Sequence, residues 1–371
     1  MALSSTLQST LLRYHYQIDT SLRTVIAKAT EHTSTRALDA FYGQMQYQLG
    51  WVDASFAPTE SNTGKLLRPT LVLLAFEAAG AWGQFPRDPS DASYLERVLP
   101  AAMAIELIHN FTLIHDDIED GDTERRHRPT LWKMWCVPQA INTGDGMFCL
   151  ARSTLWSVLE KGVEGAVAAR LAERLDRATL TLAEGQYLDI SFESRQDISV
   201  AMYIDMISRK TAALMSCAAE MGALLGTCEN VTIERLRSFG EAVGIAFQVR
   251  DDLLGVWATT AELGKTPAGD IYRRKKSLPI LHAMENANTR DQQVLRAIYQ
   301  QTDPVRPQQV EEILAIMART QSRAYCNSFL AQHCGLARTT LASVPRQCHP
   351  LSLRALDDLE TLVLFIEAAT R

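Results

Sequence analysis

Residues 111–120 read FTLIHDDIED, where an apolar run leads directly into a cluster of acidic residues. On a helix, Asp120 lies one turn beyond Asp116 and Asp117, so that the three carboxylates share one face. Unpaired charge beside apolar residues costs folding free energy unless a cation neutralises it. Carboxylate oxygens suit Mg²⁺, which also keeps waters and binds phosphate oxygens. The stretch predicts a helix that ends in a magnesium site, with a solvated acidic helix face as the alternative.

A second acidic cluster follows much later in the chain. Gln248, Asp251 and Asp252 share one helical face, but the position one turn beyond Asp251 holds Gly255 rather than an acid. Two carboxylates still suffice for a Mg²⁺ ion that keeps several waters. Two such clusters facing each other would hold several Mg²⁺ ions around a polyphosphate. The duplication therefore predicts Mg²⁺-assisted departure of a diphosphate.

Cationic residues suited to phosphate oxygens recur along the chain, because guanidinium groups bind such oxygens in bidentate geometry. They are Arg125, Arg126 and Arg128 beyond the first acidic cluster, Lys65 and Arg68 at the start of a helix, and Lys210 and Lys265 in apolar or neutral surroundings. Backbone N–H groups at a helix start also favour anions. The combination predicts a diphosphate held between metal ions and cationic side chains, although each basic segment alone also fits a solvated loop.

The distribution of proline indicates the fold class. No proline occurs between Pro138 and Pro267, and this stretch is rich in helix-forming residues. Apolar residues recur there at helical spacing, as at Leu171, Leu175, Leu180 and Leu182. The alternation of apolar and polar residues that is typical of strands is almost absent. The chain is therefore expected to be all-α.

Segment boundaries indicate one domain. Ser199 is an expected helix N-cap. Residues 80–93 form an expected loop, because glycine, proline, aspartate and serine are concentrated there. No linker rich in glycine, serine or proline separates two halves. We therefore expect a single large domain over residues 1–371.

Composition and charge exclude several classes of protein. The formal net charge of −6 and the lack of a long basic tract argue against nucleic acid as a partner. The apolar run at residues 71–76 is too short to cross a bilayer, and residues 1–17 lack a signal-peptide pattern. The 7 cysteines are scattered without a C-x-x-C motif, which predicts reduced core thiols rather than disulfides or zinc ligands. We expect a cytoplasmic protein without stable membrane insertion.

Taken together, the motifs resemble those of the trans-prenyl diphosphate synthase family, and of its geranylgeranyl diphosphate synthases in particular. In chain order they are Gly64-Lys65-x-x-Arg68-Pro69, Glu106-Leu107-Ile108-His109, Asp116-Asp117-x-x-Asp120, Arg125-Arg126-x-x-Pro129-Thr130, Lys210-Thr211, Phe247-Gln248-x-x-Asp251-Asp252 and Gly264-Lys265. The resemblance implies the isoprenoid synthase fold, a helical bundle around a central active-site cavity, and a homodimer. The chain departs from the family pattern at Thr63, Leu66, Gly255, Ala258 and Thr259.

The resemblance also implies a role for each matching residue. Three Mg²⁺ ions per active site would be bound by Asp116, Asp117, Asp120, Asp251 and Asp252. Isopentenyl diphosphate would be held by Lys65, Arg68, His109 and Arg126. The allylic diphosphate would be held by Arg125, Lys210 and Lys265, and Thr211 also belongs to the substrate-binding residues. Gln248 would face the reacting centre, and the catalytic set would comprise Asp116, Asp117, Asp120, Lys210, Gln248 and Asp251.

The implied activity is a prenyl transfer. An allylic diphosphate would ionise with the help of Mg²⁺, and the double bond of isopentenyl diphosphate would attack the cation to give geranylgeranyl diphosphate. The alternative is a terpene synthase on the same fold, which ionises a prenyl diphosphate and releases a hydrocarbon or an alcohol. Gly255 and the imperfect motif around Lys65 motivate that alternative. A non-catalytic partner subunit and a helical scaffold are further alternatives.

Product length is expected to depend on residues one or two turns before the first acidic cluster. Ile108, Phe111 and Thr112 would meet the growing chain, and an aromatic residue followed by a small one resembles the pattern of geranylgeranyl diphosphate synthases. The alternative is that Phe111 is a core residue. Three further polar residues either border the cavity or form an exposed helix face: Glu184, Gln186 and Asp189.

Overall fold

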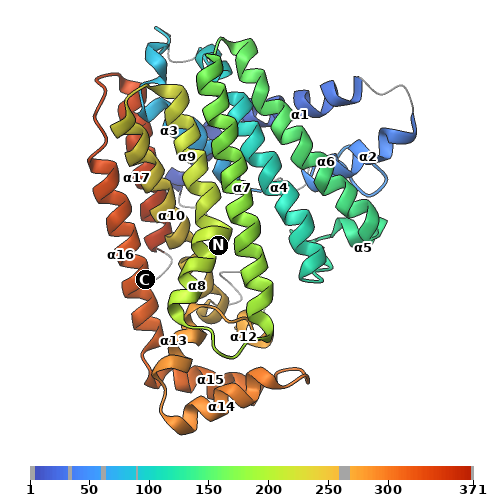
Figure 1. Cartoon of the computed structure of the whole chain (residues 1–371), viewed down its shortest axis with the longest axis vertical. Helices are drawn as coiled ribbons and strands as arrows, with labels where there is room; N and C mark the ends of the chain where they lie inside the picture. Colours follow the sequence, from blue (N-terminus) through green and yellow to red (C-terminus); the bar gives the residue numbers. More distant parts are fainter. Residues whose placement is uncertain (1–4, 32–35, 60–63, 89–90, 259–267, 369–371) are drawn as a thin grey trace.

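The computed structural model, which describes residues 5–31, 36–59, 64–88, 91–258 and 268–368, is a bundle of helices (Figure 1). The α-helices are α1 (Ser5–Glu31), α2 (Asp39–Gln48), α3 (Leu67–Ala78), α4 (Leu99–Glu119), α5 (Leu131–Trp135), α6 (Val137–Trp156), α7 (Gly165–Ser194), α8 (Val200–Ile207), α9 (Ala213–Gly226), α10 (Asn230–Trp257), α12 (Gly269–Tyr272), α13 (Leu278–Asn286), α14 (Thr289–Gln300), α15 (Pro307–Arg319), α16 (Ser322–Ala342) and α17 (Pro350–Ala368). Short helical turns are η1 (Arg36–Leu38), η2 (Ala81–Gly83), η3 (Ser93–Arg97), η4 (Ser157–Lys161) and the π-helical η5 (Ser208–Ala212). The prediction of an all-α bundle is confirmed.

The strands that the described residues form are limited to one hairpin. β1 (Glu124–Arg125) pairs antiparallel with β2 (Arg128–Pro129), and the turn residues Arg126 and His127 have φ values of 53° and 62°. A two-residue hairpin loop of type I′ has positive φ at both turn positions, a conformation that glycine and asparagine adopt more readily than arginine. Arg128 anchors the hairpin by donating hydrogen bonds to two backbone carbonyls, at the end of α2 and just beyond it. The hairpin therefore holds Arg126 in a strained backbone conformation.

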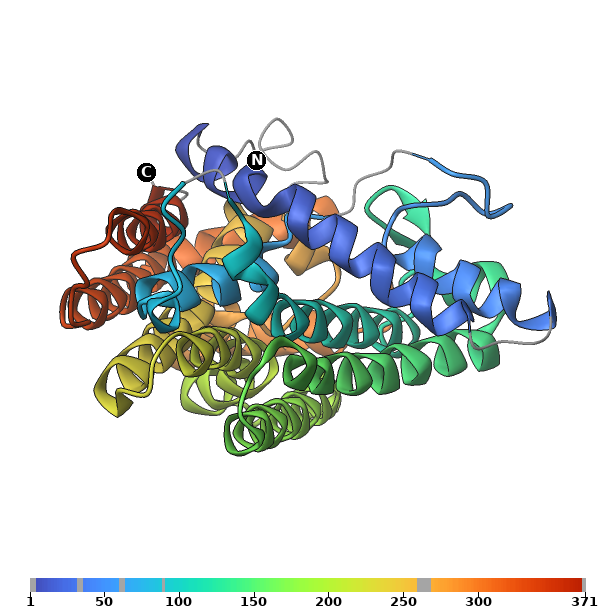
Figure 2. The same ribbon diagram turned by 90° about the horizontal axis from the view of Figure 1, so that it is seen from above.

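Helix α4 lies at the centre of the bundle. It packs against α3, α6 and α9, and α1 lies across one side of the bundle against α2, α3, α4 and α17 (Figure 2). The side chains from Pro100 to Ile108 are buried on every face of α4. A helix that is apolar all round belongs in the core. The acidic residues at the C-terminal end of α4 are therefore carried by a rigid element.

Two glycines allow α7 and α10 to approach η5 closely. A Cβ on Gly185 of α7 would lie 2.7 Å from the Cα of Lys210, and a Cβ on Gly244 of α10 would lie 2.6 Å from the Cα of Ala212. Cβ atoms do not approach other atoms so closely, so both positions require glycine. Turns of π-helix are frequent at functional sites. The close packing holds Lys210 and the adjacent Thr211 between α7 and α10.

A smaller apolar cluster lies beside the main core. It is formed around α12 to α15, with Ile271, Leu295 and Ile313 among its buried residues, and Trp257 packs against both clusters. Helices α14 and α15 form a separate layer at the lower end of the bundle (Figure 1). The expectation of one domain over residues 1–371 stays a prediction.

Two expected features of the helices can be followed residue by residue. The Ser199 side chain accepts a hydrogen bond from the amide of Met202 (3.2 Å) and caps α8, as expected. The four leucines at helical spacing all lie in α7, but Leu180 is 63% exposed. The buried face of α7 instead runs through Leu171 and Leu175, and Leu180 lies on the opposite side of the helix.

The cysteine prediction is wrong for four of the seven residues. The thiols are all free, but burial differs: Cys217, Cys326 and Cys334 are buried, and Cys136, Cys149, Cys228 and Cys348 are exposed. Between α3 and α4, the regular structure in the described part of the expected loop (residues 80–88 and 91–93) consists of η2 and the start of η3. Among the helices of the described residues, none is both long and apolar enough to span a membrane.

Candidate functional site

The first acidic cluster ends α4. The amide of Asp120 donates to the carbonyl of Asp116 (2.8 Å), so these residues stack one helical turn apart, as helical spacing requires. Asp117 is engaged instead by Arg125, whose Nε lies 2.7 Å from its Oδ1. Burial raises the pKa of Asp117 to about 6, although the guanidinium of Arg125 opposes the shift. The carboxylate of Asp117 thus faces the hairpin, and those of Asp116 and Asp120 lie along the end of the helix.

Lys210 faces this cluster from η5. Its Nζ lies 2.6 Å from Asp189 Oδ2 on α7 and 3.7 Å from Asp116 Oδ1 on α4. Burial acts to lower the pKa of Lys210, but the two carboxylates outweigh it and raise the pKa, so that the ammonium stays charged. Gln186 Nε2 donates to Glu119 Oε2 (2.7 Å). Gln186 and Asp189, whose roles could not be decided from the sequence, therefore lie at the first acidic cluster.

The second acidic cluster is linked to Lys210 through hydrogen bonds. Asp252 is buried and accepts from the Tyr203 hydroxyl (2.5 Å) and from Gln248 Nε2 (3.1 Å). Gln248 Oε1 in turn accepts from the hydroxyl of Thr211 (3.0 Å), the neighbour of Lys210. Burial raises the pKa of Asp252 to about 6. This chain of contacts joins the acidic parts of α4 and α10 through one turn of η5.

Asp251 is the exposed member of the second cluster. Its side chain is 48% exposed, whereas that of Asp252 is 1% exposed. Arg250 Nη1 lies 3.4 Å from Asp251 Oδ1, and the Arg250 guanidinium lies over the ring of Phe365, 4.5 Å from its centroid. Lys65 Nζ lies over the same ring at 5.7 Å. The ring therefore brings two cations, Lys65 and Arg250, together beside Asp251.

A further basic group lies between α3, α4 and the hairpin. Arg68 Nη1 lies 3.0 Å from His109 Nε2. Burial lowers the pKa of His109 well below its usual value, so the neutral ring accepts this hydrogen bond. Arg126 packs against Gly64, where a Cβ would lie 2.9 Å from the guanidinium carbon. Glu106 is buried, and its charge attracts both Arg68 and Arg126. The structure thus gathers Arg68, His109 and Arg126 from three segments.

The residues expected to limit product length lie on α4. Ile108 is fully buried, and the Thr112 hydroxyl donates to a backbone carbonyl of the preceding turn (2.8 Å). The Phe111 ring meets His115 edge-on, with 4.8 Å between centroids, and tilts against Phe148 of α6 at 5.5 Å. Phe111 and Phe148 therefore form one aromatic contact between α4 and α6.

Several residues of the site were not predicted from the sequence. They are Tyr203, Arg250, Asp270 and Lys275. Lys275 Nζ lies 3.9 Å from Asp252 Oδ1. The sequence feature that could have indicated Asp270 and Lys275 is their position shortly after the Gly264-Lys265 motif. Glu184, by contrast, pairs with Arg209 (2.7 Å). Lys265 itself lies outside the described residues, so its expected role stays a prediction.

The donors of both acidic clusters fit Mg²⁺ that is shared with a diphosphate. Within the described ranges, no group of three or more His, Cys, Asp or Glu side chains is assembled as a metal site. The donors at the ends of α4 and α10 are carboxylate oxygens, and Mg²⁺ takes one or two of these together with waters and phosphate oxygens. The residues present therefore suit a Mg²⁺ ion whose coordination is completed by waters and phosphate oxygens.

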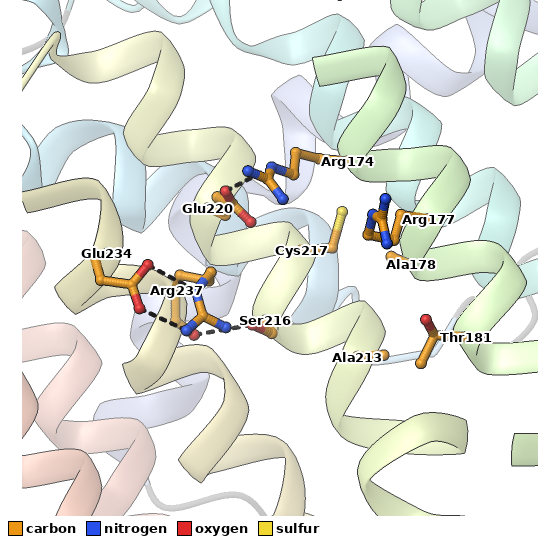
Figure 3. Close-up of a pocket in the computed structure, with 10 residues that line it drawn as sticks. All are labelled: Arg174, Arg177, Ala178, Thr181, Ala213, Ser216, Cys217, Glu220, Glu234 and Arg237. Carbon is orange, nitrogen blue, oxygen red and sulfur yellow. Dashed lines mark hydrogen bonds and ion pairs between the residues drawn. The ribbon is translucent and has the colours of Figure 1, made fainter. Parts of the chain in front are cut away.

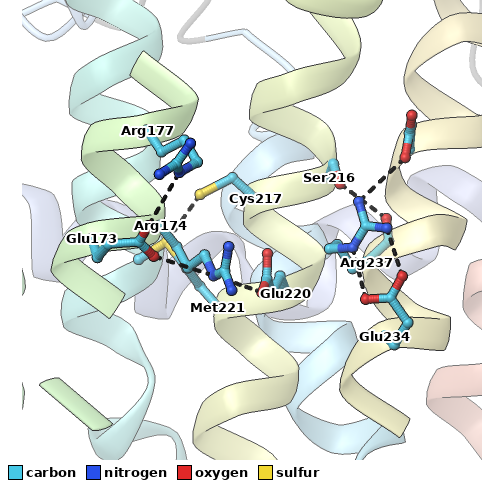
Figure 4. Close-up of polar contacts among 10 residues, drawn as sticks. Glu173, Arg174, Arg177, Ser216, Cys217, Glu220, Met221, Glu234 and Arg237 are labelled. Carbon is cyan, nitrogen blue, oxygen red and sulfur yellow. Dashed lines mark hydrogen bonds and ion pairs between the residues drawn. The ribbon is translucent and has the colours of Figure 1, made fainter. Parts of the chain in front are cut away.

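A groove of about 310 Å³ lies elsewhere, between α7, α9 and α10 (Figure 3). Its charged side chains are paired, and Arg177 has its partner, Glu173 Oε1 at 3.1 Å, beside the groove (Figure 4). Arg237 Nη2 lies 2.6 Å from Glu234 Oε1, and Arg174 Nε lies 3.0 Å from Glu220 Oε1. Because these ion pairs balance its charge, the groove offers no cationic surface comparable with the basic group around Arg68.

The sequence is similar to those of two mycobacterial synthases. It is 42% identical over 236 residues to the (2E,6E)-farnesyl diphosphate synthase of Mycobacterium tuberculosis, a match that covers 64% of this chain and 61% of that protein. The chain thus spans less than two thirds of that relative's length. It is 35% identical over 315 residues to the geranylgeranyl diphosphate synthase of Mycobacterium tuberculosis, which covers 84% of each chain.

Solved structures share the fold along almost the whole chain. The polyprenyl synthetase of Streptomyces coelicolor A3(2) matches with a TM-score of 0.83 at 31% identity, covering 97% of this chain and 99% of that one. The geranylgeranyl pyrophosphate synthetase of Pyrococcus horikoshii matches with a TM-score of 0.81 at 30% identity, covering 97% and 98%. The polyprenyl synthetase family model matches residues 50–317. The chain therefore belongs to the polyprenyl synthetase family.

Proposed function

We propose that the chain is a trans-prenyltransferase, which condenses an allylic diphosphate with isopentenyl diphosphate to give geranylgeranyl diphosphate. The observation that carries the proposal is that an acidic group and a basic group lie close to each other: the charge of Asp251 acts on Arg68, and the charge of Asp117 acts on Arg126. The acidic clusters joined through Lys210 suit a diphosphate bound with metal ions. The basic group of Arg68, His109 and Arg126 suits a diphosphate bound without metal. Condensation of two diphosphates requires both kinds of site.

The allylic diphosphate would bind at the acidic clusters. The residues proposed to hold three Mg²⁺ ions are Asp116, Asp117, Asp120, Asp251 and Asp252. When bound, Mg²⁺ supplies positive charge that stabilises the departing diphosphate. The ammonium of Lys210, fixed by Asp189 at 2.6 Å, adds a charged donor on the side of η5. Arg125, Thr211 and Lys265 would complete the contacts to this diphosphate.

Isopentenyl diphosphate would bind at the basic group. Arg68, Arg126 and Lys65 would hold its phosphate oxygens, and the neutral ring of His109 orients Arg68 through their 3.0 Å contact. Gln248, fixed between Thr211 and Asp252, would face the reacting carbon. The double bond then attacks the allylic cation, and the proton that is lost passes to the released diphosphate. No side-chain nucleophile is required.

The names of the relatives support prenyl transfer rather than the terpene synthase alternative. One relative is named a farnesyl and the other a geranylgeranyl diphosphate synthase, and the second covers more of this chain. A terpene synthase has no need of a second diphosphate site around Arg68 and Arg126. We also propose that the enzyme is a cytoplasmic homodimer whose partners are prenyl diphosphates and not nucleic acid.

Binding of isopentenyl diphosphate alone tests the second diphosphate site. Titration calorimetry of the metal-free chain with isopentenyl diphosphate is expected to give one saturable site per chain, because cationic side chains and no metal form that site. If the heats equal those of the dilution blank, prenyl transfer is refuted and a terpene synthase is the better hypothesis.

Phe111→Ala is expected to lengthen the main product by at least one isoprene unit. The substitution removes the ring that tilts against Phe148 and so opens space between α4 and α6 for a longer chain. Product masses from farnesyl diphosphate and excess isopentenyl diphosphate measure the effect. Phe329→Ala on α16 is the matched control, since it removes a partly buried phenylalanine elsewhere. An unchanged product distribution would show that Phe111 is a core residue only.

Metal affinity is expected to fall below about pH 6. Burial raises the pKa of both Asp117 and Asp252 to about 6, and a carboxylate must lose its proton to bind a cation. Below that pH a proton competes with the metal, so the apparent Kd should rise by up to about tenfold per pH unit for each carboxylate. Mn²⁺ titrations across about pH 5 to 8 measure this dependence, and Asp117→Asn should flatten it. A constant Kd at acidic pH would contradict the assignment.

A further inference from the structure

The two acidic clusters of this chain differ at one position. In the first cluster, Asp120 stacks one turn beyond Asp116 and supplies a further carboxylate on the same face. In the second cluster, the position one turn beyond Asp251 is occupied by Gly255, which has no side chain. The second cluster is therefore one carboxylate short if only α10 is considered.

The space beside Gly255 is filled by a carboxylate from another helix. A Cβ on Gly255 would lie 2.5 Å from Cγ and 2.8 Å from Oδ1 of Asp270, which belongs to α12. Cβ atoms essentially never approach other atoms so closely, so any side chain at position 255 would displace Asp270. The Asp270 carboxylate thus lies where the side chain of an acidic residue 255 would begin.

Contacts of Lys275 link Asp270 to the second cluster. Lys275 Nζ lies 3.9 Å from Asp252 Oδ1, and its amide donates to the Asp270 carbonyl (2.9 Å). Lys275 thus joins the carboxylate of Asp252 to the backbone of Asp270.

We propose that Asp270 supplies the third carboxylate of the second acidic cluster, in place of residue 255. The proposal rests on the proposed function, because it assumes that this cluster binds metal ions together with a diphosphate. It explains why position 255 is glycine, since the absence of a side chain makes room for the carboxylate from α12. The second cluster then has the same number of carboxylates as the first, drawn from two helices instead of one.

Metal binding, measured apart from turnover, tests this assignment. Mn²⁺ is titrated into the chain with inorganic pyrophosphate, and free Mn²⁺ is followed by electron paramagnetic resonance. Asp270→Asn is expected to weaken at least one Mn²⁺ site by about tenfold or more. Asp357→Asn, which changes an exposed aspartate of α17, should bind as the unaltered chain does. Unaltered Mn²⁺ binding by Asp270→Asn would overturn the proposal.

Moving the carboxylate from α12 to α10 gives a sharper test. Asp270→Gly should weaken Mn²⁺ binding, and the double variant Gly255→Asp with Asp270→Gly should restore it, because the acid then rises from the position that Asp270 fills. Gly255→Asp alone should lower the melting temperature, since its Cβ meets the Asp270 carboxylate. A double variant that melts like the unaltered chain but binds Mn²⁺ no better than Asp270→Gly would overturn the proposal.

The failure of this proposal is distinguishable from the failure of the proposed function. If the unaltered chain binds Mn²⁺ and pyrophosphate and the swap restores binding, the role of Asp270 is supported even when no prenyl chain is elongated. If the chain elongates prenyl diphosphates and Asp270→Asn leaves Mn²⁺ binding intact, the function stands and the role of Asp270 is refuted.

Discussion

Asp116→Ala is expected to lower turnover on the order of 10³-fold while the chain stays folded. The carboxylate belongs to the pair that stacks at the end of α4, and in the proposed reaction this pair would help to stabilise charge on the departing diphosphate. Lys210 keeps its closer partner, Asp189 Oδ2 at 2.6 Å, so the substitution leaves no buried cation without a counter-charge. The effect should therefore appear in turnover and not in the melting temperature.

Steady-state turnover of farnesyl and isopentenyl diphosphates, with the melting temperature measured in parallel, separates the two effects. Asp205→Ala is the matched control, because this aspartate on α8 is 56% exposed and pairs only with Arg209 among the contacts of its carboxylate. Turnover by Asp116→Ala close to that of the control would refute the metal-binding role of the first acidic cluster.

Lys210→Ala is expected to lower turnover by about 10²- to 10³-fold. The ammonium lies between the carboxylates of Asp116 and Asp189, so it faces the first acidic cluster from the side of η5. Its loss would remove the proposed contact to the departing diphosphate. It also frees two carboxylates from a cation, so the variant should bind Mn²⁺ at least as tightly as the unaltered chain does. Reduced turnover with undiminished metal binding is the expected signature.

Lys161→Ala provides the matched control for Lys210. Lys161 also pairs with a carboxylate, Glu96 Oε2 at 2.9 Å, but on the surface near η4. Turnover and Mn²⁺ binding of this variant should both be unchanged. If Lys210→Ala lost metal binding and melting temperature together with turnover, its role would be to support the fold of η5 rather than to hold the diphosphate.

Local spacing in the sequence was sufficient to predict the helices and the arrangement of the first acidic cluster. The stretch from Pro138 to Pro267 contains α6 to α10, and helical periodicity places Asp120 one turn beyond Asp116. Such features depend on neighbouring residues only. Leu180 shows where this reasoning stops, because a leucine near the apolar stripe of α7 is exposed when it lies off the buried face.

Contacts between distant segments could not be predicted from spacing. Gly255 indicates a missing acid when α10 is considered alone, whereas the structure places the Asp270 carboxylate in that space. Lys210 lies at the first cluster because Gly185 allows close packing of α7 on η5, which no motif reveals. Arg126 occupies a hairpin turn with positive φ but without glycine, so the usual turn signal is absent.

Prenyl transfer itself is tested most directly by the masses of the products. The purified chain is incubated with Mg²⁺ and farnesyl diphosphate, with and without isopentenyl diphosphate. The expected product is geranylgeranyl diphosphate, formed only when isopentenyl diphosphate is present. A hydrocarbon or an alcohol without diphosphate, formed from farnesyl diphosphate alone, would contradict it.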